Sequence, residues 1–125
     1  MKKRILTIAA VLCCAVTMVF VSSCKHEEQI RYVYEPICYF SYVGEDGSVA
    51  VEATNQYITA INNVVGSQDG VMKPIDEKVI AACDEVFNRQ KEEYGTSLLG
   101  TVQICRHDQP ISGGETMKII KEYNY

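Results

Sequence analysis

The sequence is short of the residues that metal sites and nucleic-acid interfaces usually need. It has two histidines, no tryptophan, and twelve basic residues against sixteen acidic ones. A stable zinc site takes three or four ligands, and one of the two histidines, His26, lies close to the N-terminal segment. Nucleic acid is usually bound by a basic face, which an acidic chain does not supply. We therefore predict neither a bound metal nor a nucleic-acid partner.

A complete catalytic set is missing as well. The nearest approach is Cys105, His107 and Asp108, because a thiol activated by an adjacent imidazole is a known nucleophile arrangement. Catalysis also requires a third orienting group and a pocket, and the alternative interpretation is a half-buried cysteine followed by polar loop residues. We assign no catalytic residue, and a small thiol-dependent enzyme or redox protein using Cys105 and His107 stays an alternative.

The N-terminal segment has the three parts of a secretory signal. Residues 2–4 are basic, residues 5–21 are uncharged and largely apolar, and residues 22–23 are small. The apolar run is at the short edge for a permanent spanning helix, which needs roughly 20 apolar residues. We therefore expect residues 1–23 to be a signal peptide.

The end of this segment resembles the lipobox of bacterial lipoproteins. That motif has an aliphatic residue, two small residues and then the cysteine that receives the lipid, and Val21, Ser22, Ser23 and Cys24 match it at every position. The resemblance implies that residues 21–23 are recognised by the signal peptidase and that Cys24 becomes the first mature residue. Cys24 would then carry a diacylglycerol and often a further acyl chain such as palmitate, which together give stable anchoring. This covalent lipid is the only cofactor expected. The alternative to cleavage and lipidation is an uncleaved signal anchor, which also places the domain outside the cytoplasm.

Residues 24–29 are expected to be a short lipid tether. Their charged, acidic run KHEEQ resembles the surface-export signals of Bacteroidetes lipoproteins, and the alternative is a plain solvated linker. No aspartate directly follows Cys24, so the inner-membrane retention signal of enteric bacteria is absent. The expected location is the cell envelope, at the outer membrane, on its periplasmic or surface face.

Residues 30–125 are predicted to form one small α+β domain with the element order β-α-α-β-β. Loss of residues 1–23 removes three basic residues, so the net charge changes from −4 to −7. The natural solution for this order is a two-layer sandwich, with both helices on one face of a three-stranded, mainly antiparallel sheet. The predicted elements are strand 30–43, a helix from 49 to Gly66 with Ser48 as its N-cap, a helix from Pro74 to Gly95, and strands 98–106 and 116–123.

Three cysteines remain in the domain once Cys24 is used by the lipid. An odd number allows at most one internal disulfide, and an exported compartment tends to be oxidising. Cys38 with Cys105 is the pair expected if their strands are neighbours, and separate reduced thiols are the alternative. Cys83 lies on the apolar stripe of the second helix, where a core cysteine is favoured.

The tyrosines of the first strand are the strongest indication of a binding surface. Rigid amphipathic rings favour recognition surfaces, although aromatic residues also simply favour strands. No third helix remains to cover the second sheet face, which could receive a partner protein, a glycan or a second copy of the chain. The residues assigned to this surface are Tyr32, Tyr34, Tyr39 and Tyr42. We expect a membrane-anchored binding or accessory module, with a structural homodimer as a further alternative.

Overall fold

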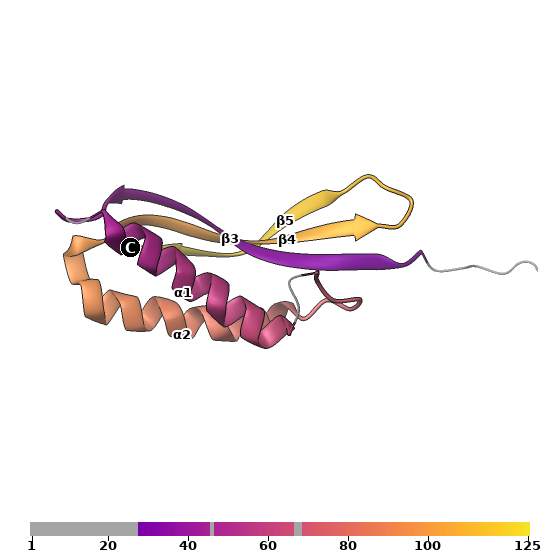
Figure 1. The fold of residues 1–125 in the computed structure, drawn as a ribbon, viewed down its shortest axis with the longest axis horizontal. Helices are drawn as coiled ribbons and strands as arrows, with labels where there is room; N and C mark the ends of the chain where they lie inside the picture. Colours follow the sequence, from indigo (N-terminus) through magenta and orange to yellow (C-terminus); the bar gives the residue numbers. More distant parts are fainter. Residues whose placement is uncertain (1–27, 46, 67–68) are drawn as a thin grey trace, which may run out of the picture.

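The computed structural model describes residues 28–45, 47–66 and 69–125. The predicted α+β fold and its element order are confirmed (Figure 1). The elements are strand β3 (Ile30–Tyr42), helix α1 (Ser48–Val65), helix α2 (Asp76–Tyr94), the short 3₁₀ helix η2 (Gly95–Ser97), strand β4 (Leu99–Pro110) and strand β5 (Thr116–Asn124). Across these ranges, neither helix is both long and apolar enough to cross a membrane.

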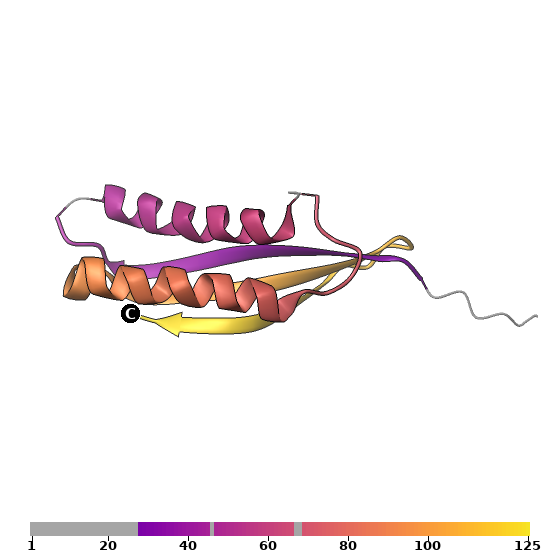
Figure 2. The same ribbon diagram turned by 90° about the horizontal axis from the view of Figure 1, so that it is seen from below.

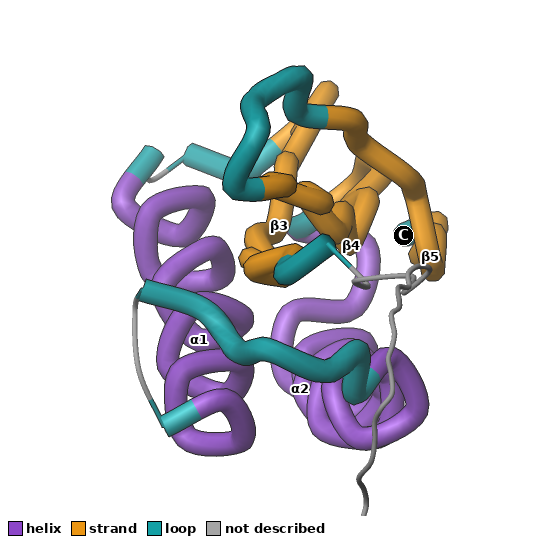
Figure 3. Tube along the Cα trace, turned by 90° about the vertical axis from the view of Figure 1, so that its right-hand side faces the viewer, coloured by secondary structure: helices purple, strands orange, loops and turns teal. Residues whose placement is uncertain are grey.

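The three strands form an antiparallel sheet in the order β3-β4-β5. Strand β3 is therefore an edge strand, which is where the ladder tolerates the missing N–H of Pro36. Both helices lie on the same side of the sheet (Figure 1, Figure 3), and Figure 2 views the domain from that side. The expected two-layer arrangement is thus present, and no helix in the described residues covers the other side of the sheet.

Helix α1 contacts the sheet through a narrow stripe of side chains. Its buried members are Ala53, Tyr57 and Ile61, which are four residues apart. The helix begins at Ser48 itself and the N-cap position is Gly47, so the prediction of Ser48 as N-cap was wrong by one residue. Gly66 ends it in the left-handed conformation that glycine adopts without steric cost, and its N–H donates to the carbonyl oxygen of Asn62.

Helix α2 buries Val79, Cys83 and Val86 on its own stripe, and one polar residue, Gln90, with them. The Gln90 amide is satisfied: its Nε2 donates to the Ala53 carbonyl oxygen at 3.0 Å and to Gln56 Oε1 at 2.9 Å. Its Oε1 accepts from the Tyr125 hydroxyl. Because a buried amide without partners would be costly, these bonds fix how α1, α2 and the C-terminus pack together.

Aromatic rings pack against one another at the end of the core next to the C-terminus of the chain. Phe87 stacks on Tyr123 with ring centroids 4.9 Å apart, and Tyr125 meets the edge of Phe87 at 5.0 Å. The Tyr123 hydroxyl donates to Asp84 on α2 at 2.6 Å. Burial raises the pKa of Tyr125 to about 12. The tyrosines near the C-terminus are therefore structural and hold β5 against α2.

Candidate functional site

The lipidation motif lies outside the described residues. Val21, Ser22, Ser23 and Cys24 precede Glu28, the first residue that the structure describes, so the assignment of Cys24 as the lipidated residue stays a prediction. The first strand, β3, starts at Ile30, six residues after Cys24.

The four tyrosines of β3 do not form one surface, so the predicted binding surface is wrong in part. Strand alternation directs Tyr32 and Tyr34 toward the helices, and Tyr34 is only 7% exposed. Tyr39 points the other way and is 58% exposed. Tyr42 follows a register shift after Phe40 and is 50% exposed. Only Tyr39 and Tyr42 remain available to a partner.

The predicted disulfide between Cys38 and Cys105 is also wrong. The two strands are neighbours, but Cys38 is opposite Val102 whereas Cys105 is opposite Glu35. This offset of three residues is roughly 10 Å along a strand, and the Cα atoms of a disulfide lie no more than about 7 Å apart. An odd offset also places the side chains on opposite sheet faces. Cys38, Cys83 and Cys105 are free thiols.

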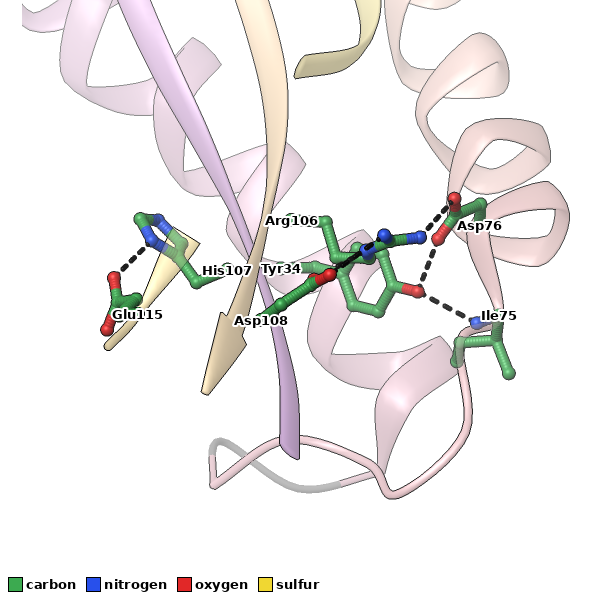
Figure 4. Close-up of polar contacts among 7 residues, drawn as sticks. All are labelled: Tyr34, Ile75, Asp76, Arg106, His107, Asp108 and Glu115. Carbon is green, nitrogen blue, oxygen red and sulfur yellow. Dashed lines mark hydrogen bonds and ion pairs between the residues drawn. The ribbon is translucent and has the colours of Figure 1, made fainter. Parts of the chain in front are cut away.

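A polar cluster surrounds Arg106, on the helix-facing side of β4 (Figure 4). Its guanidinium forms a two-pronged pair with Asp108, from Nε to Oδ1 at 2.7 Å and from Nη2 to Oδ2 at 3.0 Å. Its Nη1 donates to Asp76 Oδ2 at 2.9 Å. The guanidinium carbon also lies 5.2 Å from the centre of the Tyr32 ring, within the range of a cation–π contact.

Tyr34 completes this cluster and ties it to the start of α2. Its hydroxyl donates to Asp76 Oδ1 at 2.6 Å and accepts from the backbone N–H of Ile75 at 2.8 Å. Burial, and next the bond to Asp76, raise the pKa of Tyr34 above its ordinary range, so it stays a neutral donor. Asp76 opens α2, where the helix dipole favours a carboxylate. The cluster thus joins β3, β4 and the α2 N-terminus.

The geometry of the Arg106 cluster indicates a structural role. We call the cluster a joint because it holds β3, β4 and the start of α2 together. The bonds to Asp108 raise the pKa of Arg106 and outweigh the lowering by burial, so the residue is always charged. A hollow of about 410 Å³ lies beside it, lined by Pro74, Ile75, Asp76, Glu77, Lys78 and Arg106. However, Nε, Nη1 and Nη2 of Arg106 already bond to carboxylates. These bonds use three of the five guanidinium N–H groups, and the two carboxylates compensate the positive charge that would attract an anionic ligand.

His107 projects from the opposite side of β4, as Figure 4 shows. Its Nδ1 lies 2.7 Å from Glu115 Oε2, and its Nε2 bonds to Glu35. Burial lowers the pKa of His107, but the bonds to Glu35 and Glu115 outweigh it, so the pKa is raised overall. The His107 side chain thus forms a clip that connects β3, β4 and the end of the β4–β5 turn.

Cys105 and His107 lie on the same sheet face, but they do not form an activated pair. Cys105 is fully buried, and burial followed by the charge of Glu35 raises the pKa of its thiol. Both ring nitrogens of His107 are engaged by carboxylates, which leaves neither to accept the thiol proton. Over the described part of the chain, no group of three or more His, Cys, Asp or Glu side chains is placed to hold a metal ion.

The uncovered sheet face is the remaining candidate for a site. We call it the outer face; exposed apolar or aromatic side chains on it include Tyr39 at 58%, Met117 at 52% and Ile119 at 46%. Polar side chains pair between these strands, with Gln103 donating to Glu122 at 3.0 Å. The face is therefore mixed in character, as surfaces that bind other proteins usually are.

Sequence reasoning missed the role of Arg106. Val102, Ile104 and Arg106 alternate along β4, and the first two are fully buried. A charged residue that continues a core-facing row needs a charged partner. The available signal was thus the alternation itself, together with acidic Asp76 at the start of the second helix.

Replacing Arg106 by Met should destabilise the domain by about 1–3 kcal/mol, because Asp76 and Asp108 lose their partner while mostly shielded from water. The three side chains are 15%, 28% and 22% exposed, respectively. Urea denaturation measures the effect, with Arg89→Met, at an exposed position of α2, as the matched control. Equal stability of the two variants would contradict the role of the joint.

The His107 clip should make stability depend on pH. A raised folded-state pKa means that the contribution is complete below the unfolded value of about 6.5 and is lost as pH rises through the folded value. The difference in unfolding free energy between the parent and His107→Gln should therefore be larger at about pH 5.5 than at about pH 9. Glu115→Gln should reduce that difference. A gap between parent and variant that stays constant with pH would show that the charged imidazole is not what stabilises the clip.

Comparison with protein-family models, with curated proteins and with solved structures finds no match to this chain. The role of the domain is therefore inferred from its own contacts, charges and exposed surfaces.

Proposed function

We propose that the chain is an exported lipoprotein, anchored through Cys24, whose domain 30–125 is a binding or accessory module at the outer membrane. The anchor is supported by the lipobox resemblance of Val21, Ser22, Ser23 and Cys24. The module is supported by one observation above the others: a sheet face that no described helix covers and that bears exposed Tyr39, Met117 and Ile119.

The partner we favour is another protein of the cell envelope. An exposed apolar or aromatic surface on a small domain is a feature of interaction sites. Met117 lies opposite His107 and Ile119 lies opposite Cys105, so the side chains of Met117 and Ile119 are on the same sheet face as His107. Tyr39 adds an aromatic ring of the kind that anchors protein interfaces.

A thiol-dependent enzyme has less support from the geometry. Burial raises the pKa of Cys105, and it raises the pKa of Cys83 to about 12, which keeps both as unreactive thiols at neutral pH. The acid–base partner that Cys105 would need, His107, is held by Glu35 and Glu115.

Lipid labelling tests the anchor. Cells fed a clickable palmitate analogue should label the parent protein, and Cys24→Ala should abolish both the label and the membrane association, because the thiol is the attachment point. Cys38→Ser is the matched control and should keep both, since Cys38 lies within the folded domain. Persistent labelling of Cys24→Ala would refute the assignment.

The mass of the detergent-extracted protein tests whether the domain binds a partner through its outer face. The parent should migrate as a complex larger than the monomer, and Ile119→Asp should release the monomer with its fold intact. Val51→Asp, at a 63% exposed position on α1, should leave the complex unchanged. A mass of twice the chain would identify a homodimer as the complex, and a monomeric parent would rule out a stable partner on this face.

A further inference from the structure

We propose that the β4–β5 turn, residues 111–115, rests on the bilayer that holds the anchor, with Ile111 in the interfacial region of the lipid. This inference relies on the lipidation of Cys24 proposed above. The partner surface is thus a lipid bilayer, contacted by the end of the domain and not by a sheet or helix face.

The tether leaves the domain directly beside this turn. The Ile111 N–H donates to the carbonyl oxygen of Gln29 at 3.1 Å, and the Ser112 N–H donates to Glu28 Oε2 at 3.1 Å. The register places Ile30 opposite Pro110, so the first residue of β3 and the last of β4 are paired. Figure 1 shows the start of β3 and the β4–β5 turn at the same end of the long axis.

The chain between Glu28 and Cys24 is too short to move the turn far from the membrane. Four residues span at most about 14 Å when fully extended. Because the turn contacts Glu28 directly, its distance from the lipidated cysteine can exceed this span only by the length of that contact. The other end is much farther away: the thirteen residues of β3 extend roughly 43 Å. The C-terminus and η2 lie at that far end (Figure 1).

The side chains at the tether end suit a lipid interface. Ile111 is 77% exposed, more than any other large hydrophobic residue that the structure describes. It is followed by small, uncharged residues 112–114. The carboxylate of Glu115 is turned back to His107, which reduces its repulsion from lipid phosphates.

A second exposed apolar side chain lies at the same end. Val71, in the loop before α2, exchanges two backbone hydrogen bonds with Tyr32, of 2.7 and 2.9 Å. This bridge holds the loop against the first residues of β3, and Met72, next to it, is 55% exposed. Exposed basic residues flank the two apolar ones, with Arg31 on β3 and Lys73 in the loop. Basic and apolar side chains together favour an interface with phosphate headgroups above acyl chains.

Depth-dependent quenching tests this orientation in the full lipidated chain. The protein, extracted from membranes and carrying Cys38→Ser, receives an NBD fluorophore at Ser112→Cys or, as the matched control, at Thr96→Cys in η2. It is then inserted into vesicles of phosphatidylethanolamine and phosphatidylglycerol with a doxyl-labelled lipid. We expect a blue shift and loss of fluorescence at position 112 and neither at position 96.

Two variants separate this inference from the lipidation on which it depends. Adding Ile111→Ser should reduce the blue shift at position 112, whereas Val51→Ser on α1 should not. The intact mass of each sample reports whether Cys24 carries lipid. A lipidated sample with equal quenching at positions 112 and 96 overturns the orientation alone. A sample with no lipid on Cys24 overturns the proposed anchor, and the orientation with it.

Discussion

The antiparallel pairing of β3 with β4 is the constraint on which the rest of the molecule depends. It runs over twelve residue pairs, from Ile30 opposite Pro110 to Tyr42 opposite Leu99. Because the strands run in opposite directions, the start of β3 must lie beside the end of β4. Residues 28–29 and the β4–β5 turn are therefore neighbours, and both are remote from the C-terminus. The same register decides which side chains of the two strands share a face.

Polar contacts on the two sides of β4 complete this arrangement. On the helix side, Arg106 bonds to Asp76 and Asp108, so the first turn of α2 is held to the sheet. On the outer face, His107 connects Glu35 of β3 with Glu115 at the end of the turn. Partly buried ion pairs contribute little net stability against an apolar core, but they are costly to break. Their effect is to fix the position of one element on another.

Periodicity in the sequence was enough to predict the element order and the two-layer fold. Alternation and helical stripes report which residues face a core, and Gly66 and Gly95 mark both helix ends. The register was not predictable, because it depends on the sum of many cross-strand contacts. The pairing of Cys38 with Cys105 failed for this reason: neighbouring strands with a three-residue offset cannot bring the two thiols together. Tyr34 failed as a surface residue because its hydroxyl bonds to Ile75 and Asp76, at the start of a helix that is distant in the sequence.

The central claim is that Cys24 holds the domain upright, with the β4–β5 turn at the lipid and the outer face running away from the membrane and open to a partner. Neutron reflectometry of the lipidated chain on a supported bilayer tests it most directly. An upright domain gives a protein layer roughly 40 Å thick that begins at the headgroups, close to the length of β3. A layer only about 20 Å thick, which is one sheet and one helix layer, would show that the domain lies flat and would contradict the claim.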